Sequence, residues 1–140
     1  MKTARYLNQN INNRQFIPLR ISLGAPKFSL PYSIAANFNV VAPTREILQI
    51  DNKEAYRHEY RRYLETIGVD AIRNALRPFL QTDKETLLLC FEDLRDPDKW
   101  CHRRFFAEWW EEKTKERVPE LEEPAPERAA KNETRQMTLF

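Results

Sequence analysis

Apolar side chains recur every three or four positions in three stretches of the chain, and this spacing predicts three helices. The first covers residues 51–68, and one of its faces carries Tyr56, Tyr60, Tyr63, Leu64 and Ile67. Asp51 or Asn52 supplies a cap at its start. Gly68 stands just past its end, where a left-handed residue is favoured.

The second predicted helix covers residues 69–81, with Pro78 kinking or closing it. The third runs from Trp100 to Arg117. Two aromatic pairs in it lie four residues apart, Phe105 with Trp109 and Phe106 with Trp110. This spacing predicts a helix with one broad aromatic side, which is more typical of a core or an interface than of a surface that stacks bases.

Two apolar runs without helical spacing predict strands. Ile17 to Ser22 is rich in β-branched residues, and Thr86 to Phe91 is a continuous apolar run, as in a strand covered on both faces. The segment "TARYL", residues 3–7, is a further candidate strand. Residues 24–44 contain three prolines and no helical period, which predicts a long ordered loop.

The order strand, helices, strand, helix predicts a small α/β domain over residues 1–118, with a mainly parallel sheet and flanking helices. Residues 119–135 contain three prolines and many charges, and they lack the apolar content that would offset the entropy of ordering. We therefore expect a Pro/Glu-rich flexible linker there. The domain would then carry a flexible C-terminal tail that ends in residues 136–140.

The composition narrows the class of protein. No stretch approaches the roughly 20 apolar residues that span a bilayer, and the N-terminal segment lacks the apolar centre of a signal peptide. We expect a cytoplasmic protein with no membrane partner, in which Cys90 and Cys101 are reduced thiols. The chain has two glycines, too few for a dinucleotide fingerprint or a P-loop, and we predict no cofactor. The net charge of +2 is compatible with phosphate-bearing partners and equally with many ordinary domains.

One segment combines several reactive side chains. Cys90 and Glu92 are expected at the carboxyl end of a strand, where open α/β sheets bind ligands. Cys101, His102 and Arg103 are expected in the first turn of the next helix, whose free N–H groups favour anions. Cys101 would be a nucleophilic thiolate, His102 an acid or base, and Arg103 a phosphate ligand. Glu92, Cys101 and His102 are thus the candidate catalytic residues.

Plainer interpretations of the same residues stay open. Cys90, inside an apolar strand, is typical of a small core residue. His102 and Arg103 are adjacent on a helix, so their side chains point in different directions. The two cysteines and His102 lack a fourth ligand at a familiar spacing, and we therefore predict no metal site.

Several motifs together resemble a known family. The segments "RISLGAPKF", "VVAPTREIL", "TLLLCFEDLRDPDKWCHRRFFAEWWEE" and "VPEL" are similar to the small bacterial and phage domain of unknown function numbered 488. The resemblance covers roughly residues 3–118. It implies an α/β fold without an established activity. It nominates as site residues Arg20, Cys90, Glu92, Cys101, His102 and Arg103, of which Arg20, Arg103 and Cys90 would bind ligand or phosphate.

The last five residues, "QMTLF", resemble the peptide by which bacterial replication and repair proteins bind the sliding clamp of DNA polymerase. The resemblance implies that Gln136 occupies a small polar subsite of the clamp and that Leu139 and Phe140 enter a deep apolar pocket. Met137 stands where leucine is usual. The alternative is a frayed terminus, or a Leu-Phe pair folded back onto its own domain.

Three functions follow from these features. The first is a clamp-tethered accessory protein of DNA replication or repair, whose body acts on or binds DNA or nucleotides. The second is a non-catalytic clamp binder, of the kind a phage would encode to exclude host proteins. The third is a small-molecule enzyme with an incidental tail. The sequence leaves open whether the chain is an enzyme.

Overall fold

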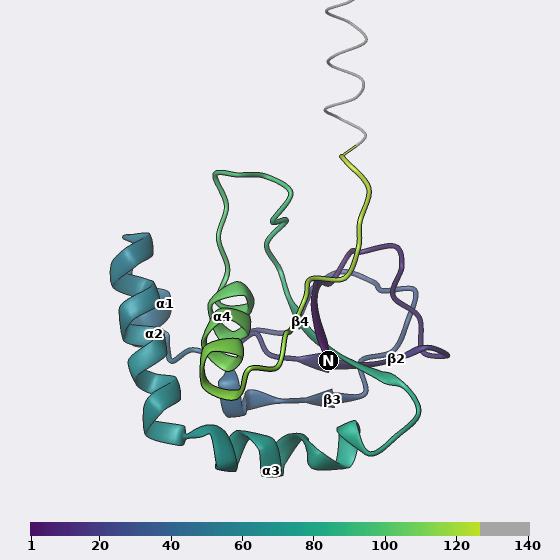
Figure 1. Cartoon of the computed structure of the whole chain (residues 1–140). Helices are drawn as coiled ribbons and strands as arrows, with labels where there is room; N and C mark the ends of the chain where they lie inside the picture. The colour runs from purple at the N-terminus through teal and green to yellow at the C-terminus, as the bar shows by residue number, and fades with distance from the viewer. Residues whose placement is uncertain (127–140) are drawn as a thin grey trace, which may run out of the picture.

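Four short strands form one parallel sheet at the centre of the molecule (Figure 1). The computed structural model describes residues 1–126. The strands are β1 (Lys2–Arg5), β2 (Phe16–Arg20), β3 (Ala36–Asn37) and β4 (Glu85–Cys90), and their order in the sheet is β1-β4-β2-β3. Every pairing is parallel, so the carboxyl ends of the strands lie at one edge of the sheet. The predicted α/β class with a parallel sheet and flanking helices is confirmed.

The helices are α1 (Arg45–Leu48), α2 (Lys53–Ile67), α3 (Val69–Leu80) and α4 (His102–Thr114), and a 3-10 turn, η1, covers Asn39–Val41. Three of the helices, α2, α3 and α4, follow the predicted periods, whereas α1 and the 3-10 turn were not predicted. Asn52 caps α2 by accepting a hydrogen bond from the backbone N–H of Ala55. Gly68 joins α2 to α3 with a φ of 89°, a conformation that favours glycine. Helix α4 is shorter than predicted because its first turn starts after Cys101 and its last is closed by Lys115 in a left-handed conformation.

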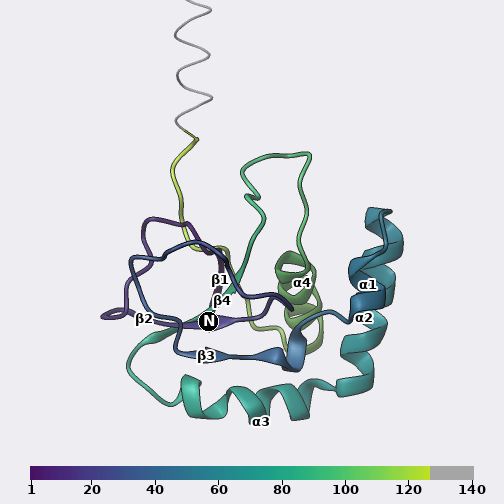
Figure 2. The same cartoon turned by 180° about the vertical axis from the view of Figure 1, so that it is seen from behind.

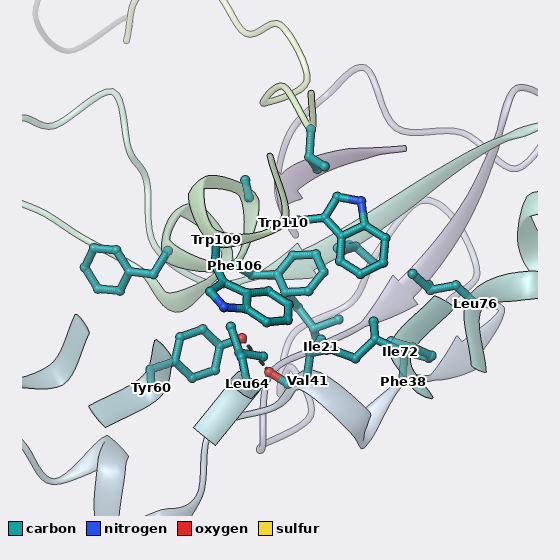
Figure 3. Close-up of a cluster of buried hydrophobic side chains, with 14 of the residues drawn as sticks. Ile21, Phe38, Val41, Tyr60, Leu64, Ile72, Leu76, Phe106, Trp109 and Trp110 are labelled. Atoms are coloured by element: carbon teal, nitrogen blue, oxygen red, sulfur yellow. Dashed lines mark hydrogen bonds between the residues drawn. The ribbon is translucent and has the colours of Figure 1, made fainter. Parts of the chain in front are cut away.

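The helices and the loops cover opposite sides of the sheet (Figures 1 and 2). On the helix side the aromatic face of α4 packs between α2 and α3 (Figure 3). The fully buried side chains of this core include Tyr60, Leu64, Ile72, Leu76, Phe106 and Trp110. The Tyr60 hydroxyl donates a 2.6 Å hydrogen bond to the Val41 carbonyl, which ties α2 to the turn after β3.

The other side of the sheet packs against loops. Tyr6, Tyr32 and Leu121 gather there from segments far apart in the sequence, over the side chains of Leu87 and Leu89. The intervening Leu88 belongs to the helix side, so β4 alternates between two cores and is buried on both faces, as its sequence predicted. The predicted loop over residues 24–44 is also ordered, although it contains the unpredicted strand β3.

The domain continues past the boundary at Val118 that the sequence predicted. Glu120 forms a parallel bridge with Thr3, and the Leu121 N–H donates a 2.7 Å hydrogen bond to the Thr3 carbonyl. Leu121 is buried, and Glu123 pairs with Arg5 at 2.6 Å. Residues 119–124 are therefore part of the folded body, because partners at the other end of the chain supply contacts that their composition does not reveal. The rest of the predicted linker, from residue 127, lies outside the described residues. Within residues 1–126 no helix has the length and apolar character that a membrane span requires.

Candidate functional site

A cavity of about 510 Å³ opens at the carboxyl edge of the sheet. The segments after β2 and β4, the start of α4, and residues of α1 and α2 enclose it. Its lining comprises Ser22, Leu23, Gly24, Leu48, Tyr56, Cys90, Phe91, Glu92, Asp98, Lys99, Trp100, Cys101 and His102. The position is the one expected of a ligand site in an open parallel sheet.

Two thiols and an imidazole meet at the buried end of this cavity. Cys90 is the last residue of β4, Cys101 immediately precedes α4, and His102 is the first residue of α4. His102 Nδ1 lies 3.6 Å from Cys90 Sγ and 3.8 Å from Cys101 Sγ. All three residues are buried. We call these residues the thiol–imidazole cluster.

A backbone carbonyl fixes the His102 ring. Its Nε2 lies 2.8 Å from the carbonyl oxygen of Ile21, in the segment that follows β2. A carbonyl can only accept, so Nε2 carries a proton and donates it. In the neutral ring Nδ1 is then the unprotonated nitrogen, and it faces both sulfurs. The ring of Tyr60 packs edge-on against the imidazole at 5.5 Å and holds it in place.

The two thiols ionise differently. Burial opposes ionisation of Cys101, but a hydrogen bond from Cys90 and the nearby His102 and Arg103 side chains outweigh it and lower the Cys101 thiol pKa well below its usual range. Burial raises the pKa of Cys90 well above the usual range, and the interaction with Cys101 raises it further. Of the two thiols, Cys101 is therefore the one whose surroundings favour ionisation.

Arg103 is not part of the cavity, and its predicted role as a phosphate ligand is wrong. Its side chain is fully buried, and its Nε and Nη2 donate to the Glu120 carboxylate at 3.0 and 2.7 Å. Thr3 donates to the same carboxylate at 2.7 Å. Burial opposes the Arg103 charge, but Glu120 outweighs it and raises the guanidinium pKa. Arg103 thus anchors the C-terminal segment, and it points away from His102 as adjacent helix positions should.

Arg20 and Glu92 differ in their relation to the cavity. Arg20 donates to the carbonyl oxygens of Ser22 and Leu23 at 3.3 and 3.2 Å, so it shapes the turn that forms one wall and does not line the cavity. Its predicted role as a ligand contact is therefore replaced by a supporting one. Glu92 lies in the wall, half-exposed, with its carboxylate 3.7 Å from Lys99 Nζ. The structure thus brings Cys90, Glu92, Cys101 and His102 to one cavity.

Two aromatic walls were missed by the sequence reasoning. The rings of Tyr56 and Trp100 meet at a centroid distance of 4.8 Å beside the cluster. Helical spacing assigned Tyr56 to the apolar face of its helix, which is correct, but a period cannot show that this face ends at a cavity. Trp100 directly precedes Cys101, and that adjacency was the available signal.

The candidate clamp-binding residues Gln136, Met137, Leu139 and Phe140 lie outside the described residues. Comparison with protein-family models, curated proteins and solved structures found no match to the chain. The family resemblance and the clamp motif therefore stay predictions from the sequence.

Proposed function

We propose that the chain is a sliding-clamp-tethered accessory protein of DNA replication or repair, whose body acts on a nucleotide or on a single unstacked base of DNA. The observation that carries the activity of the body is the thiol–imidazole cluster at the end of an aromatic-walled cavity. The Gln-x-x-Leu-Phe pattern of residues 136–140 carries the tether. We place the protein in the cytoplasm, in keeping with the free thiols of Cys90 and Cys101.

The size and walls of the cavity favour a nucleobase-sized ligand. A volume of about 510 Å³ is in the range of small-molecule sites and is far too small for a DNA duplex. Tyr56 and Trp100 offer faces and edges against which a flat ring can pack, a contact worth about 1–3 kcal/mol per base in single-strand binding proteins.

The charges around the cavity favour the base over the phosphate as the group that enters. Two carboxylates, Glu92 and Asp98, line it together with one ammonium group, that of Lys99. Arg103, the predicted phosphate ligand, is turned away and neutralised by Glu120. A phosphate would therefore remain outside the cavity, and Glu92 is the group placed to exchange a proton with a bound ligand.

The tether is tested by titrating the full chain against a purified sliding clamp. Burial of two large apolar side chains, reduced by the cost of ordering the peptide, predicts a micromolar dissociation constant. Leu139→Ala combined with Phe140→Ala should abolish binding and leave the folded body unchanged. A wild-type chain that fails to bind below millimolar concentration would remove the tether from the proposal.

The ligand class is tested by calorimetry with nucleosides, nucleotides and inorganic phosphate. We expect nucleosides and nucleotides to bind with similar affinity and phosphate alone to show no binding. Trp100→Ala should weaken nucleoside binding by at least tenfold, corresponding to the loss of one stacking contact. The control Leu80→Ala alters an exposed apolar side chain at the end of α3, outside the cavity, and should bind as wild type. Phosphate binding that equals nucleotide binding would contradict this assignment.

A further inference from the structure

We propose that the thiol–imidazole cluster binds one zinc ion, through Cys90 Sγ, Cys101 Sγ and His102 Nδ1, with the fourth coordination position open to the cavity. The inference rests on the proposed function of this cavity as a reaction site, and it names the ion that the site would hold. It revises the expectation of no metal site that the sequence spacing gave.

The distances between the donor atoms match a tetrahedral zinc site. With bonds of about 2.3 Å to sulfur and about 2.05 Å to nitrogen, tetrahedral angles place each sulfur about 3.6 Å from the nitrogen. The observed distances from His102 Nδ1 are 3.6 Å to Cys90 Sγ and 3.8 Å to Cys101 Sγ. The three donor atoms all lie within 4.8 Å of one another. An ion could therefore enter with little movement of the side chains.

His102 Nδ1 cannot accept a good hydrogen bond from both sulfurs at once. The unprotonated nitrogen of a neutral imidazole has one lone pair and accepts one good hydrogen bond. Here two sulfurs approach the same nitrogen from two different segments of the chain, the end of β4 and the start of α4. An ion between the three atoms would satisfy all of them at once.

The surroundings of the cluster resemble the outer shell of a metal site. Metal-binding histidines almost always donate their other ring N–H to a carbonyl or carboxylate, and His102 Nε2 donates to the Ile21 carbonyl at 2.8 Å. The ligands sit at the ends of regular elements and are buried, so their positions are set before an ion binds.

The donor set selects the kind of ion. Two thiolates and an imidazole favour zinc over magnesium or calcium, which prefer oxygen ligands. Three protein ligands with one open position are typical of catalytic zinc sites, in which a bound water becomes acidic. The cavity wall supplies Glu92, whose carboxylate could take a proton from such a water. The sequence offers no fourth protein ligand at a familiar spacing, and a catalytic zinc site does not need one.

The test uses the full chain without an affinity tag, purified under reducing conditions, stripped of metal and then reconstituted with Zn²⁺ or Co²⁺. We expect one zinc ion per chain by elemental analysis. The cobalt form should show the ligand-field bands of a tetrahedral ion and thiolate-to-cobalt charge transfer. Cys101→Ser and His102→Gln should each weaken zinc binding by more than about tenfold. His58→Gln, which alters the other histidine on the exposed side of α2, should bind zinc as wild type.

Three results would overturn the proposal. They are a folded chain that takes up no stoichiometric zinc, a cobalt spectrum without thiolate charge transfer, and variants that keep wild-type affinity. Should a variant fail to fold, the cobalt spectrum of the unaltered chain still decides, because it reports the thiolate ligands directly. The clamp and nucleoside titrations are independent readouts, so their failure and the failure of zinc binding are distinguishable.

Discussion

The two faces of the sheet are covered by different means, helices on one side and loops on the other. The helix-covered face buries many large apolar side chains, among them Phe106 and Trp110, which are fully enclosed between α2 and α3. The loop-covered face contains fewer buried side chains, and individual polar contacts hold its segments in place. Tyr32 donates to the Tyr6 carbonyl at 2.7 Å, and Tyr6 in turn shares a 2.5 Å hydrogen bond with Ser22.

The helix side is expected to determine the global stability of the domain, and the loop side the placement of individual segments. Apolar contacts on the helix side are numerous and non-directional, so their loss should lower the stability of the whole molecule. On the loop side each contact joins segments distant in sequence, so its loss should release one segment. The cavity lies where the two faces meet, since Tyr56 comes from α2 and Ser22 is bonded to Tyr6 of the other face.

The largest effect should come from truncating the helix-side core. Trp110→Ala removes a fully buried indole, and substitutions of this kind cost about 3–5 kcal/mol of unfolding free energy. Chemical denaturation should show a lower midpoint in a single transition, with fast amide exchange throughout the domain. A loss below about 1 kcal/mol, or exchange confined to α4, would contradict a cooperative helix-side core.

The next largest effect should come from Glu120→Ala. This change leaves the buried Arg103 guanidinium without its counter-ion, and breaking such a pair costs about 3–5 kcal/mol. We expect a value at the lower end, because a quarter of the Glu120 side chain is exposed. Denaturation measures the loss, and faster exchange of the Leu121 amide reports release of residues 119–124.

Glu122→Ala is the matched control for that change. Its side chain is exposed in the same segment, so its effect should stay within about 0.5 kcal/mol. If the two variants lost equal stability, the Arg103–Glu120 pair would not be the contact that holds the segment.

A smaller and more local effect is expected for Tyr32→Phe. The substitution removes one buried hydrogen bond and leaves the Tyr6 carbonyl without that donor, at a cost of about 1 kcal/mol. Amide exchange should quicken around residues 30–34 and remain slow in α2 and α4. Tyr63→Phe, on the helix side, should change neither the free energy of unfolding nor the amide exchange measurably. An equal loss of stability in that variant would contradict the difference between the two faces.

The smallest effect should come from acid. Hydrogen bonds from Arg95 hold the pKa of the Asp93 carboxyl at about 2, below the usual value of 3.8. A depressed carboxyl pKa contributes stability that is present above about pH 4 and is lost as the pH falls toward 2. Arg95 also donates to the Pro124 carbonyl at 2.7 Å, so protonation should loosen the contact with the C-terminal segment.

Comparison with Asp93→Asn isolates that contribution, because other carboxyl groups titrate in the same range. The wild type should be more stable than the variant by less than about 1 kcal/mol near neutral pH, since the pair is partly exposed. The difference should shrink steadily below pH 4 and be small by about pH 2. A difference that stays constant with pH would contradict the assignment.

The sequence predicted the parts of the molecule that local patterns determine. Helical spacing located α2 and α3 to within a residue or two, and the apolar run located β4. Cys90, Glu92, Cys101 and His102 were expected at one site because one connection joins the end of β4 to the start of α4. That connection covers residues 91–101, and both of its ends lie at the carboxyl edge of the sheet.

The remaining features depend on contacts that no local pattern encodes. Arg103 has Glu120 as its partner, and Glu120 lies in a stretch whose prolines and charges predicted a linker. Tyr32 lies in a segment without a period, and its position is set by Tyr6. The convergence of two sulfurs on His102 Nδ1 likewise depends on the Ile21 carbonyl, which fixes the ring from the segment after β2.

The bridge between Thr3 and Glu120 also bears on how copies of this protein behave toward one another. A strand at the border of a sheet offers unpaired backbone groups to which a strand of a neighbouring molecule can add, and this is a common route to aggregation. Along β1 that border is occupied by the chain's own residues 119–121, and the opposite border, β3, is only two residues long. The sheet is therefore closed to extension along β1, and a crowded solution of this protein gains protection from a pairing that its composition gave no reason to expect.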